Sequence, residues 1–104
     1  MSPRDVFRQA GPVFIAVGES NRQQIILLLC EYESMGVNEL TTHLSISRPA
    51  VSHHLKVLQS AGLIKVVRLG TQRLYSLDIG EGINLLKDFV SAIEQSQKFK
   101  EGRL

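Results

Sequence analysis

The sequence contains little cysteine and no long apolar run. Cys30 is the single cysteine among 104 residues, so one copy of the chain can form neither a disulfide framework nor an all-thiolate metal site. The longest apolar run, residues 25–30, falls far short of the roughly 18 apolar residues that a membrane helix needs. No segment with the basic, apolar and small-residue order of an export signal opens the sequence. We therefore expect one small globular domain in the reducing cytoplasm, with no membrane partner.

Acidic residues are missing from the middle of the sequence. None lies between Glu39 and Asp78, an interval that holds five lysine and arginine residues. The rest of the chain has more acidic than basic residues, so the small net charge of +2 conceals a polarised distribution. A basic segment between acidic ends is typical of a surface that binds a polyanion, although a solvated face with chance spacing would give the same count. The five cations are Arg48, Lys56, Lys65, Arg68 and Arg73.

Hydrophobic periodicity predicts two helices in the first third of the chain. Apolar residues recur at helical spacing over residues 4–17, where Pro12 and the glycine before it should kink or split the helix. Ser20 and Gln23 have the spacing of a capping box and mark the start of a second helix over residues 21–34. Because its apolar run leaves no polar side, we expect this second helix at the centre of the core.

A helix-turn-helix follows. A short third helix covers residues 37–44, and Ser47 is a suitable N-cap for a fourth helix over residues 48–61. Pro49 is tolerated in the first turn of that helix, and Gly62 ends it. The buried stripe of the fourth helix is predicted to consist of Val51, Leu55 and Leu58.

A change of period marks a hairpin and a last helix. From residue 63 the apolar residues alternate, and Gly70 suits the first central position of a type II′ turn. A helix over residues 82–98 then has apolar residues on one stripe. The predicted fold is mainly α with a small β-hairpin, in the order helix, helix, helix, helix, strand, strand, helix.

The side of the fourth helix opposite its buried stripe is small, polar and cationic. A helix in the DNA major groove needs such a face, because short residues allow close approach and cationic donors meet guanine edges or phosphates. An ordinary solvated face is the alternative. Ser52 and His53 point apart on this helix, so they do not form a nucleophile and base, and nothing else indicates an enzyme. The candidate recognition residues are Ser47, Arg48, Pro49, Ser52, His53 and Lys56.

The hairpin carries several cations beside this helix and is interpreted as a wing. Cations on such a ribbon contact phosphates or a minor-groove wall, although they also keep an exposed edge strand from aggregating. The candidate wing residues are Lys65, Arg68, Thr71 and Arg73.

These segments resemble a known family. Residues 47–64, SRPAVSHHLKVLQSAGLI, and residues 68–77, RLGTQRLYSL, are similar to the recognition helix and wing of the ArsR family of winged-helix bacterial repressors. Residues 19–28 are also similar to that family, and the likeness covers about residues 19–78. It implies a winged helix-turn-helix that binds operator DNA as a homodimer.

The sequence departs from the family at three places. Many members bind a metal through cysteine in a stretch resembling Cys-Val-x-Asp-Leu, where this chain has Gly36 at the leading position and residues 37–40 after it. The last helix also lacks histidine, so we expect no metal and no cofactor. Related wings often have a cation directly after the turn glycine; here Thr71 stands there, and Arg73 becomes the substitute.

Both terminal helices carry apolar faces that a winged-helix core does not need. In a two-fold dimer they would pack against their mates and set two recognition helices about 34 Å apart, although they could instead cover their own core. The expected organisation is a single domain over residues 1–104, with a dimerisation helix at 1–18, a core at 19–78 and a second dimerisation helix at 79–98. The candidate dimer residues are Phe7, Phe14, Leu86, Phe89, Val90 and Ile93.

The sequence therefore predicts a DNA-binding transcriptional repressor that recognises an inverted-repeat operator as a homodimer and is not a typical metal sensor. A winged-helix module that binds an acidic protein partner is one alternative. A second is a redox-responsive repressor that uses Cys30, although a cysteine in an apolar run is more often a buried hydrophobe. A repressor of this kind could respond to a small-molecule or redox effector, and the sequence leaves the identity of that effector open.

Overall fold

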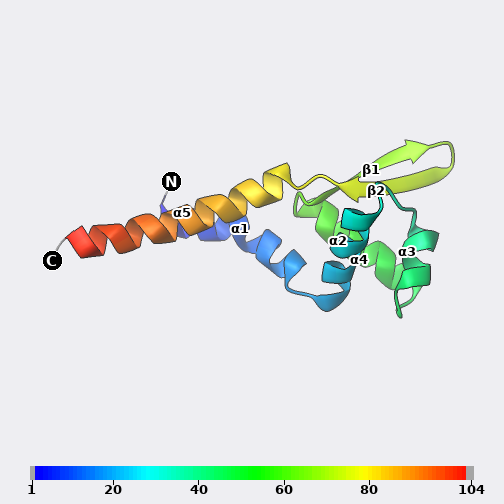
Figure 1. The fold of residues 1–104 in the computed structure, drawn as a ribbon, viewed down its shortest axis with the longest axis horizontal. Coiled ribbons are helices and arrows are strands. Elements are labelled where there is room, and N and C mark those ends of the chain that lie inside the picture. Colours follow the sequence, from blue (N-terminus) through cyan, green and yellow to red (C-terminus); the bar gives the residue numbers. More distant parts are fainter. Residues whose placement is uncertain (1, 103–104) are drawn as a thin grey trace.

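The predicted order of helices and strands is confirmed in the computed structural model, which describes residues 2–102. Across these residues there are five helices and one two-stranded antiparallel hairpin, which projects from one end of the molecule (Figure 1). The elements are α1 (Pro3–Val17), α2 (Ser20–Glu31), α3 (Val37–His43), α4 (Arg48–Ser60), β1 (Ile64–Leu69), β2 (Gln72–Leu77) and α5 (Gly80–Gly102).

Helix α1 is continuous, so the expected split at Pro12 is wrong. Proline removes one backbone donor from the helix interior. The helix continues past it because a fully buried stripe at helical spacing holds both sides of the proline in place. That stripe consists of Val6, Ala10, Val13 and Ala16.

Helix α2 begins and ends differently from its prediction. Its N-cap is Glu19, whose carboxylate accepts from the Arg22 N–H at 2.9 Å, whereas Gln23 donates to the Val17 carbonyl at 2.8 Å. The expected capping box of Ser20 and Gln23 is therefore wrong, because a carboxylate one residue earlier takes the capping position. The helix ends at Glu31, three residues before the predicted end.

Only one side of α2 enters the core, which corrects the expectation of a fully central helix. Ile25 and Leu29 are buried, but Leu27 is 66% exposed and Cys30 is exposed as well. The expectation that Cys30 is a small buried hydrophobe is thus wrong. Met35, in the loop after α2, fills the core instead and forms an isolated antiparallel bridge with Tyr75 of β2.

The hairpin has the predicted turn. Strands β1 and β2 pair from Ile64 opposite Leu77 to Leu69 opposite Gln72. Gly70 has a φ of +65°, and no non-glycine residue among those described has a positive φ, which is the combination that a type II′ turn requires at Gly70 and Thr71.

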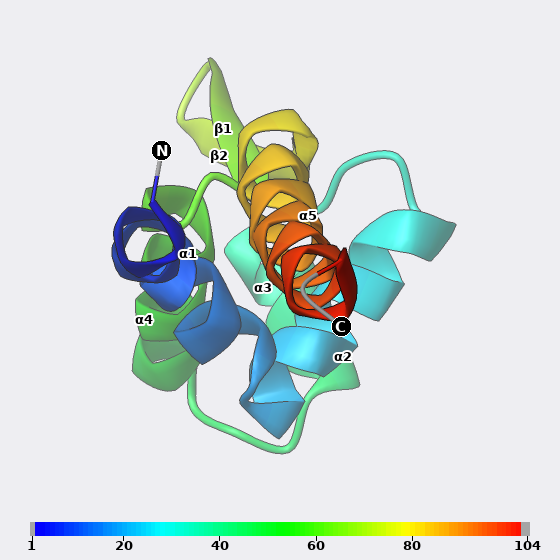
Figure 2. The same cartoon turned by 90° about the vertical axis from the view of Figure 1, so that its left-hand side faces the viewer.

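The molecule is elongated, with principal extents of 60 × 26 × 22 Å. The wing, as we call the β1–β2 hairpin, lies with α3 at one end, and both described chain ends lie at the other (Figure 1). Helices α1 and α5 pack side by side, as the end-on view in Figure 2 shows. Among residues 2–102, no helix combines the length and the apolar character that crossing a membrane requires.

Candidate nucleic-acid interface

Helix α4 begins at a side-chain cap and packs through one stripe of apolar residues, so its outer face stays exposed. The Ser47 hydroxyl accepts from the Ala50 N–H at 3.3 Å, and proline follows in the first turn. The predicted stripe is confirmed, since Val51, Leu55 and Leu58 are at most 1% exposed. The residues at 48, 49, 52, 53 and 56 are all exposed on the remaining surface of the helix.

The alternation of the wing strands divides its cations between two faces. Arg68 and Arg73 are directly opposed in the register and lie on the same face of the hairpin as the buried residues Ile64 and Tyr75. Lys65 lies on the other face of the strand. Two like charges directly opposite each other destabilise a hairpin, and an anion between them would relieve that cost.

A hollow of about 660 Å³ lies between α4 and the wing, and we call it the wing hollow. Five of the predicted residues line it: Arg48, Ser52, Lys56, Thr71 and Arg73. It is also lined by Gln59 of α4 and Gln72 of β2, which the sequence analysis missed, and by the start of α3. The signal for Gln59 was present, because positions 48, 52, 56 and 59 share one side of a helix.

The remaining predicted residues lie elsewhere. Ser47 caps α4, and Pro49 is exposed at its first turn. His53 lines a second, smaller hollow of about 320 Å³ between α1 and α4, together with Pro12 and Ile15. Lys56 borders both hollows.

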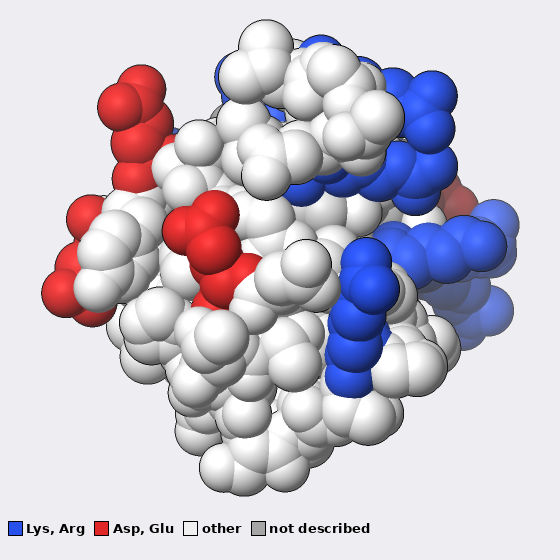
Figure 3. Space-filling model, turned by 90° about the vertical axis from the view of Figure 1, so that its right-hand side faces the viewer, with Lys and Arg blue, Asp and Glu red and all other residues white. Residues whose placement is uncertain are grey.

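The wing hollow is positively charged. Within the part of the chain that the structure describes, Arg8 forms an ion pair with Asp5, and the Glu19 carboxylate lies 3.7 Å from Nδ1 of His54, so no mid-chain Lys or Arg has an acidic partner within 4.0 Å. Glu39 lines the hollow, but its carboxylate accepts from the Gly36 N–H at 3.2 Å. Figure 3 shows Lys and Arg gathered along one side of this end of the molecule, with most Asp and Glu side chains on the opposite side.

Part of the predicted dimer surface is covered within one chain. The ring of Phe89 packs edge-on against Phe7 and Phe14, with ring centroids 4.5 and 4.8 Å apart, respectively. Leu86 packs against the core. Phe7 still has 54% of its surface exposed despite this packing. Val90 and Ile93 are also accessible, with exposures of 50% and 48%.

No group of three or more His, Cys, Asp or Glu side chains in the described part of the chain is placed to hold a metal ion. Gly36, the leading residue of the stretch compared with metal-binding sequences above, is the N-cap of α3, and the residues after it form the first turn of that helix.

Comparisons with known proteins agree with this architecture. The model of the family described as bacterial regulatory protein, arsR family, matches residues 19–66. The transcriptional repressor SdpR of Bacillus subtilis is 33% identical over 82 residues, which is 76% of this chain and 90% of SdpR. The chain belongs to the ArsR family. It is a transcriptional regulator of the winged helix-turn-helix type.

Further likenesses to this ArsR-family chain come from an archaeal sequence and a bacterial structure. An uncharacterised HTH-type transcriptional regulator of Methanocaldococcus jannaschii is 36% identical over 69 residues, covering 66% of this chain and 78% of that protein. The structure of an ArsR-like transcriptional regulator from Rhodococcus sp. RHA1 has a TM-score of 0.83 at 24% identity. The likeness covers 99% of this chain and 92% of the Rhodococcus chain, and it shows that the whole fold, terminal helices included, recurs in solved structures.

Proposed function

We propose that this ArsR-family regulator is a homodimeric repressor that binds an inverted-repeat operator with α4 and the wing. The observation that carries the proposal is the wing hollow, where Arg48, Lys56 and Arg73 converge from two elements without an acidic partner among the described residues. Three unpaired cations around a concave surface have a favourable partner in a chain of phosphates.

The position of the hollow between α4 and the wing suits one sugar-phosphate strand. The major groove of B-DNA admits an α-helix, and a single backbone strand separates it from the neighbouring minor groove. With α4 in the major groove and the wing at the minor groove, that strand lies in the wing hollow. Lys56 and Arg73 then contact phosphates, while Arg48 and Ser52 at the N-terminal half of α4 reach base edges.

The apolar surface of α1 and α5 is assigned to the dimer. Phe7, Val90 and Ile93 remain about half exposed although both helices already pack on each other. A second copy related by a two-fold axis covers such a face and places two α4 helices on successive major grooves about 34 Å apart. The terminal segments 1–18 and 79–98 thus dimerise, and residues 19–78 bind DNA. The repressor name of SdpR supports repression.

We also propose that the protein acts in the cytoplasm, catalyses no reaction and binds no metal. An effector would act by favouring the DNA-free geometry, and about 1–3 kcal/mol of coupling is enough for a useful switch.

The test is a gel shift with the DNA upstream of the gene. Arg48→Ala and Lys56→Ala should weaken binding, whereas Lys98→Ala, an exposed cation on α5, should not. The affinity of the wild-type protein should fall by about 0.9 logarithmic units per phosphate contact for each tenfold rise in salt. Binding that is insensitive to salt, or that all three variants retain, would contradict the proposed interface.

A further inference from the structure

Arg22 is the one buried charged side chain among the residues that the structure describes, with 8% of its surface exposed. A buried charge destabilises a fold unless hydrogen bonds satisfy it, so its partners show what it does. Arg22 lies in the first turns of α2, away from the wing hollow, and the proposed DNA contacts do not use it.

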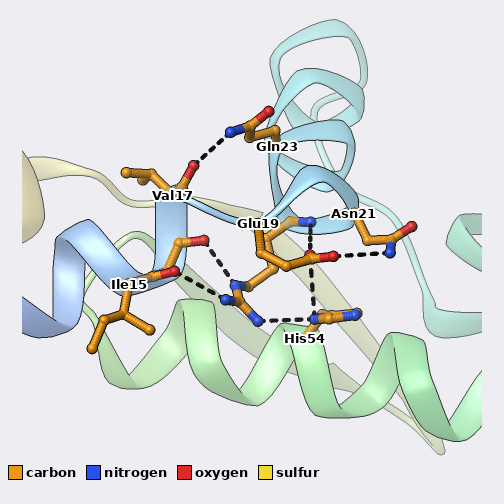
Figure 4. Close-up of polar contacts among 8 residues, drawn as sticks. Ile15, Val17, Glu19, Asn21, Gln23 and His54 are labelled. Carbon is orange, nitrogen blue, oxygen red and sulfur yellow. Dashed lines mark hydrogen bonds and ion pairs between the residues drawn. The ribbon is translucent and has the colours of Figure 1, made fainter.

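Two of the bonds cap the end of α1. The Nε of Arg22 donates to the Ala16 carbonyl at 2.8 Å, and Nη2 donates to the Ile15 carbonyl at 2.9 Å (Figure 4). The last carbonyls of a helix have no partner within the helix and carry partial negative charge. Because α1 has no basic residue in its last turn and Gly18 has a φ of −83°, outside the left-handed cap conformation, α2 supplies the missing cation.

The third bond reaches α4. Nη1 of Arg22 lies 3.1 Å from Nδ1 of His54, whose side chain is 14% exposed. Because a guanidinium only donates, His54 must accept at Nδ1 and carry its proton on Nε2. His54 therefore links Arg22 of α2 to α4.

Glu19 completes the cluster. Its Oε2 accepts from the Arg22 N–H at 2.9 Å and lies 3.7 Å from Nδ1 of His54, and its Oε1 accepts from Asn21 at 3.0 Å. The carboxylate therefore binds the Arg22 backbone at the same corner (Figure 4). One side chain therefore joins the end of α1, the start of α2 and the inner side of α4.

We propose that Arg22 is a positioning residue for DNA recognition, which fixes the orientation of α4 relative to α1. Apolar packing is non-directional, whereas the three bonds of a planar guanidinium have fixed directions. Helix α1 packs along α5, so the Arg22 cluster connects the recognition helix to the surface assigned to the dimer. A dimer that engages two half-sites at once needs this angle, because a tilt of α4 displaces the second helix from its groove.

This inference rests on the proposed function and makes a different prediction. Binding to one half-site needs only α3, α4 and the wing, whereas binding to a full operator also needs the correct angle between the two copies. Loss of the cluster should therefore lower full-operator affinity about tenfold while changing half-site affinity little, a factor within the range of measured couplings between contacting residues.

The experiment compares Arg22→Lys, His54→Leu and the double variant on full-operator and half-site DNA by fluorescence anisotropy, at a temperature where circular dichroism shows each to be folded. Lysine keeps the charge but lacks the planar donor set. Each single variant should lower the ratio of full-site to half-site affinity, and the double variant should lower it no further. His54→Gln, which keeps an acceptor for Nη1, should restore most of the ratio.

Gln23→Met is the matched control, since Gln23 also caps α1 through the Val17 carbonyl and its recorded hydrogen bond does not involve α4. It should leave the ratio unchanged. Equal losses on full and half sites, or a control that behaves like Arg22→Lys, would overturn the positioning role. If Arg22→Lys does not fold, His54→Leu carries the same test. Failure of the wild-type protein to bind any operator would instead reject the proposed function.

Discussion

Gly82 of α5 lies directly against the loop after α4. Its N–H donates to the Gly62 carbonyl at 3.1 Å, and a Cβ at this position would lie 2.6 Å from Cδ2 of Leu63. Leu63 is only 3% exposed and has little room to move. We expect Gly82→Ala to lower the free energy of unfolding by about 1–3 kcal/mol, measured by urea denaturation.

The control for this substitution is Gly80→Ala, two residues earlier, where an added Cβ meets no atom within 4 Å. It should leave stability nearly unchanged. Equal free energies of unfolding for the two variants would show that the loop after α4 moves to accommodate the added methyl group without destabilising the fold.

Glu19 gives the molecule a pH-dependent helix cap. The hydrogen bond from the Arg22 backbone N–H, with further hydrogen bonds from Asn21, lowers the pKa of Glu19 below its usual value of 4.5. Because the folded pKa is below the unfolded one, the carboxylate stabilises the fold above about pH 4.5, and this contribution is lost as the pH falls through the folded pKa.

We therefore expect Glu19→Gln to be less stable than the wild-type protein near neutral pH and the difference to shrink in acid. Thermal unfolding followed by circular dichroism between about pH 7 and pH 3 measures both. A difference that stays constant over this range would contradict the role of the carboxylate charge.

Among the elements, α4 and the wing are those that the sequence predicted best, because their signals are local. Ser47 marks the start of α4, and Gly70 marks the turn of the wing. The start of α2 was mispredicted because Glu19 and Ser20 are both possible N-caps. Only the folded backbone shows that the Glu19 side chain accepts the hydrogen bond from the first turn of the helix. Which side of α2 is buried also depends on elements distant in the sequence. The residues around Cys30 alone therefore do not predict that its side chain is exposed.

The candidate site shows the same division. Rotation by about 100° per residue was sufficient to place Arg48, Ser52 and Lys56 on one side of α4. That His53 faces α1 instead of the wing depends on where α1 packs, which periodicity does not reveal. The Arg22 cluster was not foreseen at all, because its partners come from three elements that meet only in the fold.

The strand alternation of the wing leads to a prediction that separates two of its cations. Arg73 lines the wing hollow, whereas Lys65 lies on the opposite face. We expect Arg73→Ala to weaken operator binding and to reduce the slope of log affinity against log salt by about 0.9, the value for one phosphate contact. Lys65→Ala should change neither, as gel shifts over a series of salt concentrations can measure. Equal effects of the two substitutions would show that both faces of the wing contact DNA.

At the scale of the whole molecule, the cationic and apolar surfaces lie towards opposite ends of a long axis. The wing hollow is at one end, and α1 and α5 extend towards the other (Figure 1). The sequence predicted both surfaces but not that Phe89 would pack between Phe7 and Phe14 of its own chain, since contacts between segments so far apart leave no local pattern. These contacts make α1 and α5 a platform that is already formed in one copy.

That platform predicts how the dimer can be disrupted without unfolding the chain. Ile93 is 48% exposed on α5, so Ile93→Glu places a charge on the proposed interface and leaves the packing of Phe89 intact. We expect sedimentation to show monomers, thermal stability to change little apart from the lost dimer contacts, and full-operator affinity to fall about 100-fold or more, because avidity between half-sites is lost. Half-site affinity should persist, since the α4 surface is unchanged. Leu27→Glu, at a more accessible apolar position on α2 that is 66% exposed, should remain dimeric. If Leu27→Glu dissociates and Ile93→Glu does not, the dimer forms through α2, and the two recognition helices are set by a different axis.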